Sequence, residues 1–552
     1  MTTVRHSVPI SSLAKIIRSK NAGPFQLTVD LLFPTEDSYT RVRDSGVVTP
    51  AAVAAAYQIP LSEVPGVYFW DTALAIKVTL ARGASAGALG DLDCYGAQQH
   101  APLLGLMVPE PSSLGCSRPR ARNKQSVVCV GQQEAPMREV HETARDLRLD
   151  PDLEQELLSP AYLSNPYPIY ARMPHDPSVV WSEAFRCWFL TGYDDVLWAV
   201  REPKLTVRQR IPALVAGLAE EDRERAQPLI DHYAASMAFW DGPRHRTVRA
   251  LFQGPFSAAA VEVLRPAIQG FVDAYLDAAG PDEIDLMPEL ASFLPIDVIG
   301  KMLGVPSPDR AQFGPWSESI LEFSATGRTT RALTEAAVQG LSEMRRYLQG
   351  VIDERGRQPQ DDFISWLIAQ EHTLTDDEVL ANCVQLYMAG HATTRTFMGN
   401  AFLALFRHPD QLQKLRERPQ LIKGAVEELL RYSTSFQRAW RVADEDVEYQ
   451  GCVIREGDPV YPLVAAANHD PAKFVHPDVL DIEGKRKPHM SFGRGIHFCL
   501  GADLARLEAA VAITTFLRRF PKARHVEERV VWGTHPPGST LGTLHSLPVR
   551  LR

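Results

Sequence analysis

Hydrophobic and polar positions divide the chain into two parts with different periods. In the first hundred or so residues, short apolar runs alternate with turn-forming residues, which predicts an α/β unit of short elements. We expect a helix over 11–19, a strand over 25–32, a helix after Pro50, and strands over 67–70 and 75–80. In the C-terminal part of the chain, the apolar positions follow a mostly helical period.

The longest helical pattern begins at Thr375, where Thr375 and Glu378 fit a capping box, and it runs without proline until Pro409. About 30 residues at 1.5 Å each predict a helix roughly 45 Å long, which is enough to cross a whole domain. We therefore expect this helix at the centre of the protein. Gly390 and Thr393 lie near its middle, where glycine and hydroxyl side chains allow the hydrogen-bond ladder to open at a kink or π-bulge.

The stretch between the two parts has no apolar period. It is rich in Pro and Ser, and it carries four basic residues within 118–124, a composition that resists packing. We interpret it as a solvated tether, with docking to an acidic partner as the alternative. The predicted organisation is a small α/β domain over 1–110, a linker over 111–149 and a mainly α domain over 150–552.

A polar cluster lies close to glycines near the end of the small domain. Its members are Asp91, Asp93, Gln98, Gln99 and His100. Such a cluster could form a small-molecule or metal site, but a hydrogen-bonded turn is the simpler interpretation.

Composition and charge exclude several classes of protein. The 552 residues are 45% hydrophobic and 23% charged, which is typical of a globular chain and not of a disordered or fibrous one. A net charge of -9 gives no indication of nucleic-acid binding or of a basic membrane surface. No apolar run reaches the roughly 18 residues of a membrane span, and the first residues lack the apolar core of a secretory signal. We therefore expect a soluble cytoplasmic protein.

The strongest chemical signal is the segment FGRGIHFCLG over 492–501. Cys499 directly precedes a segment of helical period, so we expect its thiol at a helix N-terminus, where the dipole and free N–H groups stabilise a thiolate. The glycines before Cys499, which have no Cβ, let the backbone approach a large flat ligand closely. Phe492 could shield the sulfur from water. The seven cysteines include no CxxC pair, so we expect neither a disulfide framework nor a zinc site.

This segment resembles the haem-binding loop of the cytochrome P-450 family, F-G-x-G-x-H-x-C-x-G, and three further family patterns occur in the expected order. Glu428 and Arg431 in VEELLRY resemble the buried E-x-x-R pair. AGHATT over 389–394 resembles the oxygen-binding stretch of the long central helix. The H-x-x-x-R pattern over 245–249 resembles the helix that offers cations to the haem propionates. The resemblance covers nearly everything from about residue 158 onward.

The resemblance implies a cytochrome P-450 fold, in which a mainly helical domain carries small β-sheets, and haem b whose iron is bound by the thiolate of Cys499. Phe492, Gly493 and Gly501 would belong to the haem-binding loop, and Glu428 with Arg431 would support the haem-side core. Charge-assisted hydrogen bonds would hold the two propionates. The residues expected to provide them are His245, Arg249, Arg441 and His497.

The resemblance also implies that Thr393 and Gly390 are catalytic positions, with Thr393 positioning oxygen and protons. The family usually has an acid immediately before this threonine, and this chain has Ala392 there. Protons must then come through water, through His391 or from a residue elsewhere.

The expected function is that of a haem-thiolate monooxygenase, which inserts one oxygen atom from O2 into a small apolar organic substrate by hydroxylation or O-dealkylation. We expect the substrate to contact the loop over 205–240, Leu386, Met388 and the segment over 436–440. No flavin or iron–sulfur domain is visible in the sequence, so electrons from NAD(P)H are expected through a separate ferredoxin and ferredoxin reductase. Nucleic acid and membrane are not expected as partners.

Two alternatives stay open. Ala392 suggests a peroxide-using or non-oxidative haem-thiolate enzyme. A haem-containing ligand-binding or sensory protein, in which the small domain reports or recruits, is the alternative from another class.

The small domain has a resemblance of its own. Residues 11–105, with RSKNAGPFQLTVD, DTALAIK and DCYGAQQHAPL, resemble a domain of unknown function associated with acyclic-terpene-utilisation (AtuA-like) proteins. This resemblance implies no established activity, so the role of the small domain stays open.

Overall fold

The computed structural model separates into two units, Met1–Val128 and Cys129–Arg552, and each is described by itself. The described residues are 7–21, 26–57, 59–70, 74–81, 103, 106–109, 147–159, 162, 164–174, 178–216, 218–325, 330–484, 487–533 and 544–552. The polar cluster over 91–100 and nearly all of the expected linker lie outside them.

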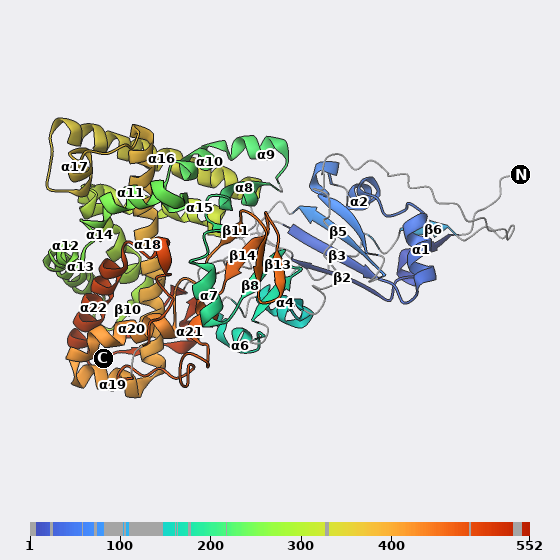
Figure 1. The fold of residues 1–552 in the computed structure, drawn as a ribbon. Helices are drawn as coiled ribbons and strands as arrows, with labels where there is room; N and C mark the ends of the chain where they lie inside the picture. Colours follow the sequence, from blue (N-terminus) through green and yellow to red (C-terminus); the bar gives the residue numbers. More distant parts are fainter. Residues whose placement is uncertain are drawn as a thin grey trace, which may run out of the picture. The chain divides into compact units, whose positions relative to one another are not determined.

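The small unit is built on an antiparallel sheet with the strand order β2-β3-β5-β4 (Figure 1). Its strands are β2 (Ile16–Asn21), β3 (Gln26–Leu32), β4 (Gly66–Trp70) and β5 (Ala75–Ala81). Val29 and Leu31 of β3, with Ile76 and Val78 of β5, alternate along their strands and are fully buried. They share a core with residues of α1 (Glu36–Asp44) and α2 (Pro50–Tyr57). A short pair, β1 (Ser7–Pro9) with β6 (Met107–Pro109), completes the unit.

One expectation for the small unit is wrong. The segment over 11–19 is not a helix, because a 3-10 turn over Ile10–Ser12 is followed by strand β2. β2 pairs with β3 from Ile16 opposite Leu32 to Asn21 opposite Leu27. The consecutive β-branched residues Ile16 and Ile17 favour this extended form, and the ladder with β3 stabilises it. The other expected elements of this unit are present.

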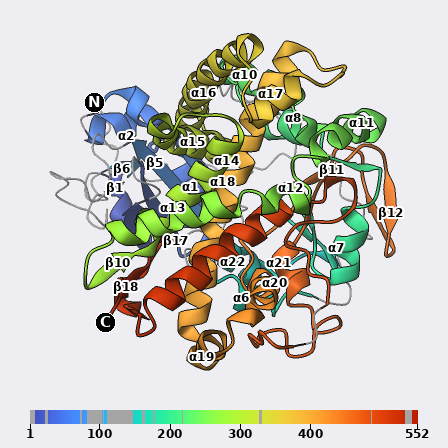
Figure 2. The ribbon, with the colours of Figure 1, turned by 90° about the vertical axis from the view of Figure 1, so that its left-hand side faces the viewer.

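The large unit is mainly helical and has small sheets, as expected. Its helices are α4 (Pro151–Leu157), α6 (Tyr167–Tyr170), α7 (Tyr193–Ala199), α8 (Arg210–Val215), α9 (Glu220–Arg225), α10 (Gln227–Ala234), α11 (Gly242–Gln253), α12 (Ala258–Glu262), α13 (Arg265–Ala278), α14 (Phe293–Met302), α15 (Phe313–Ala325), α16 (Arg331–Arg357), α17 (Phe363–Ile368), α18 (Asp376–Arg407), α19 (Pro409–Glu417), α20 (Ile422–Tyr432), α21 (Val464–Asn468) and α22 (Ala502–Arg519). Figure 2 shows α22 lying beside α13 and α20, against which it packs.

The largest sheet of this unit has the strand order β7-β8-β14-β11-β9, in which only β8 and β14 run parallel. A second sheet has the order β10-β18-β15, and β12-β13 and β16-β17 form hairpin-like pairs. The strands are β7 (Val179–Ser182), β8 (Cys187–Leu190), β9 (Leu205–Thr206), β10 (Glu283–Asp285), β11 (Arg441–Ala443), β12 (Val447–Tyr449), β13 (Cys452–Ile454), β14 (Pro459–Pro462), β15 (Arg524–His525), β16 (Val531–Trp532), β17 (Leu544–Ser546) and β18 (Pro548–Arg550).

Helix α18 is the expected long central helix. Its 32 residues begin after the N-cap Thr375, whose side chain accepts from the Glu378 amide while the Glu378 side chain accepts from the Thr375 amide. Most of its side chains are buried, and it packs against α14, α15, α16, α20 and α22. No π-segment interrupts it, so the expected π-bulge near Gly390 is not formed. Among the described residues, no helix has the length and apolar character that a membrane span requires.

Candidate active site

The loop that carries Cys499 leads directly into α22. The Cys499 amide donates to the Phe492 carbonyl at 2.9 Å and closes the loop. Gly493 and Gly495 have φ values of +64° and +73°, in the left-handed region that favours glycine. A Cβ at position 495 would lie 3.0 Å from the Val200 carbonyl oxygen. These two glycines therefore set the shape of the loop.

Gly501 is different from the other glycines of the motif. Its φ of -86° is ordinary, and nothing lies within 4 Å of the point where a Cβ would be. This open position beside Cys499 leaves room for a large flat ligand, although the close approach was expected at the glycines before Cys499, Gly493 and Gly495.

The expected stabilisation of the Cys499 thiolate needs a correction. Cys499 lies two residues before Gly501, the N-cap of α22, rather than inside the first turn. Burial raises the pKa of its thiol above the usual value, and the Gly501 amide and the charges of Arg249 and Arg506 only partly oppose this. A bound metal ion removes the proton from a coordinating thiol. The protein alone therefore favours the thiol, and metal binding would produce the thiolate.

Phe492 is held by an ion-paired network that the motif search missed. The Arg506 guanidinium carbon lies 4.6 Å from the centroid of the Phe492 ring. Arg506 also donates to both carboxylate oxygens of Glu427, at 2.6 and 3.1 Å, and His489 contacts the same carboxylate at 3.4 Å. Burial by itself would raise the pKa of Glu427, but the hydrogen bonds from His489 and Arg506 outweigh it and bring the pKa to about 2.

Two arginines near the loop, the buried Arg441 and the partly buried Arg249, have no carboxylate partner among the described residues. Arg249 donates to the Phe498 carbonyl, and Arg441 donates to the Trp440 carbonyl at 3.0 Å. Burial lowers the pKa of both guanidinium groups, that of Arg441 to about 10. Buried charges are normally paired, so these two cations indicate an anionic ligand that lies outside the chain itself. The two propionates of haem fit this requirement in number and in charge.

The structure brings His245 and His497 together beside these arginines. Their ring centroids are 4.3 Å apart, and His497 Nε2 lies 3.2 Å from Asp241 Oδ1. Burial, together with His497 and Arg249, lowers the pKa of His245 to about 4. The protein itself therefore presents two guanidinium cations and two largely neutral imidazoles here, instead of four cations. Asp241, which orients His497, had no sequence signal of its own.

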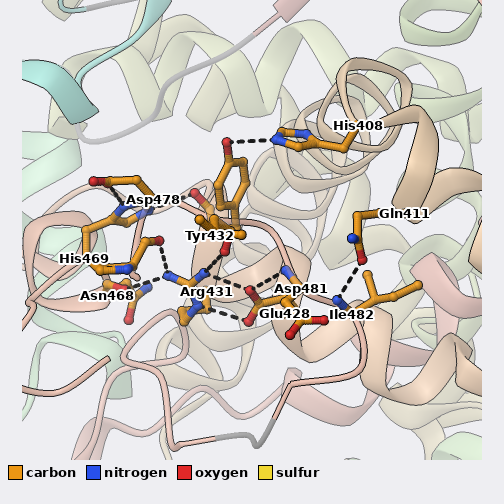
Figure 3. A network of polar contacts seen from close by, with 12 residues as sticks. His408, Gln411, Glu428, Arg431, Tyr432, Asn468, His469, Asp478, Asp481 and Ile482 are labelled. Atoms are coloured by element: carbon orange, nitrogen blue, oxygen red, sulfur yellow. Dashed lines mark hydrogen bonds and ion pairs between the residues drawn. The ribbon is translucent and has the colours of Figure 1, made fainter. Parts of the chain in front are cut away.

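Glu428 and Arg431 form a buried ion pair on α20 (Figure 3). Arg431 Nε and Nη2 donate to the two carboxylate oxygens at 2.9 and 2.7 Å. Arg431 also donates to the carbonyls of Asn468, Pro477 and Val479 at 3.1, 2.7 and 3.1 Å. The pair therefore ties α20 to the chain that leads towards the Cys499 loop.

On α18, Gln385, Ala389 and Thr393 share one face, because they are spaced by four residues. Ala389 is exposed in the middle of an otherwise buried helix, and the Thr393 hydroxyl donates to its carbonyl at 2.9 Å. Leu386 and Met388, which are expected to contact substrate, are buried in the hydrophobic core of the large unit.

Gly390 and His391 face other elements. A Cβ at Gly390 would lie 3.3 Å from Ile299 of α14, so this glycine permits close packing of two helices. His391 is buried, and its Nδ1 lies 2.9 Å from the Ser317 hydroxyl of α15. Burial lowers the pKa of His391 to about 3. His391 is therefore neutral and bonded to α15 rather than to Thr393, which argues against it among the three proton sources named from the sequence.

Comparisons with known proteins agree with this arrangement. The cytochrome P450 family model, written here P-450, matches residues 323–529, and the model of a domain of unknown function, DUF4387, matches residues 10–107. A biotin biosynthesis cytochrome P-450 from Bacillus subtilis is 38% identical over 368 residues, which are 66% of this chain and 91% of that protein. The cytochrome P-450 monooxygenase PikC from Streptomyces venezuelae is 36% identical over 418 residues, 73% of this chain and 95% of its own length.

Solved structures give the same result. The crystal structure of P-450 BioI in complex with hexadec-9Z-enoic acid ligated acyl carrier protein matches with a TM-score of 0.66 at 34% identity, over 71% of this chain and 99% of that chain. The epothilone D-bound cytochrome P-450 EpoK also has a TM-score of 0.66, at 29% identity, over 72% of this chain and 98% of its own. The chain therefore belongs to the cytochrome P-450 family of monooxygenases, which are oxidoreductases, and it carries an N-terminal DUF4387 domain.

Proposed function

We propose that the chain is a haem-thiolate monooxygenase in which Cys499 is the axial ligand of haem b. The observation that carries this proposal is a pair of guanidinium groups near the Cys499 loop, buried for Arg441 and partly buried for Arg249, which have no carboxylate partner among the described residues. In this proposal they bind the propionates together with His245 and His497, whose imidazoles donate further hydrogen bonds when they are protonated. Bound haem supplies the activation of O2, with one oxygen atom inserted into the substrate and the other reduced to water.

The proton path in this proposal depends on Thr393. Ala392 offers only a methyl group, and His391 is hydrogen-bonded to Ser317 on another face of α18. The Thr393 hydroxyl lies on the exposed face beside Ala389, where it can hold a water molecule and pass a proton from it. Proton delivery through Thr393 and water is therefore the route that these residues support.

We further infer that the electrons come from NAD(P)H through a separate ferredoxin and ferredoxin reductase, because no flavin or iron–sulfur motif is visible in the sequence. The substrate is an organic molecule with an apolar body. Delivery on a carrier protein is one form of this proposal, because the related P-450 BioI structure contains a fatty acid ligated acyl carrier protein.

The spectrum of the reduced, carbon-monoxide-bound protein tests the assignment of Cys499. The wild-type protein should show the red-shifted Soret band of thiolate-ligated haem, and Cys499→Ser should abolish it. Cys452→Ser is the matched control, because Cys452 lies on β13 and its thiol donates to the Tyr449 carbonyl. This variant should keep the band. Retention of the band in Cys499→Ser would overturn the assignment.

A peroxide-using or non-oxidative haem-thiolate enzyme is the second candidate. Ala392 favours it, because this helix places no acid directly before Thr393. Product formation with hydrogen peroxide, and none with NAD(P)H and redox partners, would move this candidate to first place.

A further inference from the structure

A third arginine, Arg210, places a guanidinium in an aromatic cluster of the large unit. It begins α8, and its guanidinium carbon lies 5.0 Å from the ring centroid of Phe239 and 5.3 Å from that of Trp440. No carboxylate of the described residues forms an ion pair with it, and its buried Nε has no acceptor there. Burial lowers the pKa of Arg210, and the charge of Arg438 lowers it further.

A second unsatisfied donor lies in the same cluster. The indole Nε1 of Trp440 is buried and has no acceptor within the described part of the chain. Buried N–H groups in folded proteins are nearly always hydrogen-bonded, so two such donors on contacting side chains call for an explanation. Arg441, the next residue, adds positive potential, since its pKa is lowered partly by Arg210. The cluster therefore presents donors and positive charge to whatever binds it.

The haem propionates do not account for this positive charge. Haem carries two carboxylates, and Arg249 and Arg441 already balance them in the proposed function. Arg210 is a surplus cation that is partly buried, and withdrawing a cation from water without a counter-ion is costly. It begins α8 within the stretch 205–240, which was expected to be a loop and instead carries α8, α9 and α10. Trp440 comes from the segment over 436–440, and these two segments are the ones expected to line the substrate side.

The surroundings of Arg210 also indicate the rest of the ligand. Phe239 and Trp440 flank the guanidinium, and the phenol rings of Tyr233 and Tyr461 are near enough to influence its pKa. These aromatic side chains can pack against an apolar part of a ligand. The planar guanidinium group matches the two oxygens of a carboxylate.

We propose that Arg210 and Trp440 form a subsite that binds the carboxylate of an organic acid with an apolar body. Arg210 is then a residue that determines specificity. The proposal rests on the proposed function in calling this acid the substrate and in assigning Arg249 and Arg441 to the haem propionates, but binding of the acid does not depend on how the haem iron is ligated.

Calorimetric titration of the full-length haem protein tests the subsite. The probes are straight-chain monocarboxylic acids from octanoic to hexadecanoic, each compared with the primary alcohol of the same length. At least one acid should bind roughly tenfold or more tightly than its alcohol, the size of a charge-assisted hydrogen bond. If no acid shows this preference, the proposal is overturned.

Three variants locate the preference. Arg210→Leu should remove it and leave the alcohol affinity unchanged, and Arg210→Lys should retain part of it, because the charge stays while the planar fork is lost. Arg208→Leu is the matched control, since Arg208 lies two residues away, is exposed and pairs with Asp444; it should keep the full preference.

Haem content per chain and the carbon-monoxide spectrum are recorded for each variant. If Arg210→Leu loses haem but keeps the preference for acid over alcohol, Arg210 is a propionate ligand and the proposal is overturned. If the wild-type protein lacks the thiolate band but its acid preference depends on Arg210, the proposed function fails and the subsite stands.

Discussion

Replacing Arg431 by methionine should destabilise the large unit severely. The buried guanidinium group of Arg431 donates hydrogen bonds to the Glu428 carboxylate and to three backbone carbonyls, all of which the variant loses (Figure 3). The Arg431 side chain is 6% exposed and that of Glu428 is 13% exposed. Removing one partner of a buried ion pair costs about 3–5 kcal/mol, since the remaining charge stays buried without compensation. The three carbonyls that lose their hydrogen-bond donor increase this cost, but the separate costs cannot simply be summed because all of these groups share one partner.

The expected loss is a large share of the roughly 5–15 kcal/mol that stabilises a typical domain. We expect little folded haem protein from Arg431→Met. The free energy of unfolding of Arg431→Lys should lie between those of Arg431→Met and the wild-type protein, because lysine keeps the charge but loses the bidentate geometry. Urea denaturation followed by far-ultraviolet circular dichroism and by the Soret band measures the loss in free energy of unfolding.

Arg265→Met is the matched control for Arg431→Met. Arg265 pairs with Glu262 at the same spacing of three residues, but the two side chains are 45% and 59% exposed. Exposed pairs contribute about 1 kcal/mol or less, so this variant should remain close to wild type. A loss below about 1 kcal/mol in Arg431→Met, or equal losses in both variants, would refute the argument from burial.

Three further predictions follow from the structure. Burial lowers the pKa of His232 from 6.5 to about 3, so the folded protein loses stability as the pH falls from 6.5 towards 3 and protonation of the buried imidazole is resisted. His232→Leu should therefore reduce the fall in melting temperature between pH 6.5 and pH 4. An unchanged fall would contradict this prediction. Thr393→Ala should uncouple the enzyme, so that NAD(P)H is consumed and peroxide replaces product, whereas Ala392→Glu should raise coupling or leave it unchanged; coupled turnover in the first variant and its loss in the second would refute the proposed proton route. A chain beginning at Leu147 should fold and bind haem, because the Leu149 amide already bonds to the Trp181 carbonyl at 2.8 Å within the large unit; an insoluble or haem-free product would show that the two units depend on each other.

Several local features could be predicted from the sequence because neighbouring residues determine them. The capping box of Thr375 and Glu378 starts α18 as expected, and the proline-free pattern ends with that helix before Pro409. The spacing within the Cys499 motif identified a glycine-shaped loop in front of a helix, and two of its glycines have the positive φ that favours this residue. The family also followed from motif order along the chain.

Burial and long-range partners could not be predicted in this way. The period of α18 does not show which face meets α14 and α15, so His391 was one of three possible proton sources, although its imidazole is buried and bonded to Ser317 of α15. The same holds for the raised pKa of Cys499, which burial sets.

The surplus charge of Arg210 also became visible only in the folded chain. Its aromatic neighbours Phe239 and Trp440 are distant in sequence, and no local pattern brings them together. The sequence by itself determined the long helix α18, the glycine-shaped loop before α22 and the residue types available for chemistry. The tertiary structure decided which of those groups are desolvated and which have partners, because desolvation and pairing depend on contacts between distant segments.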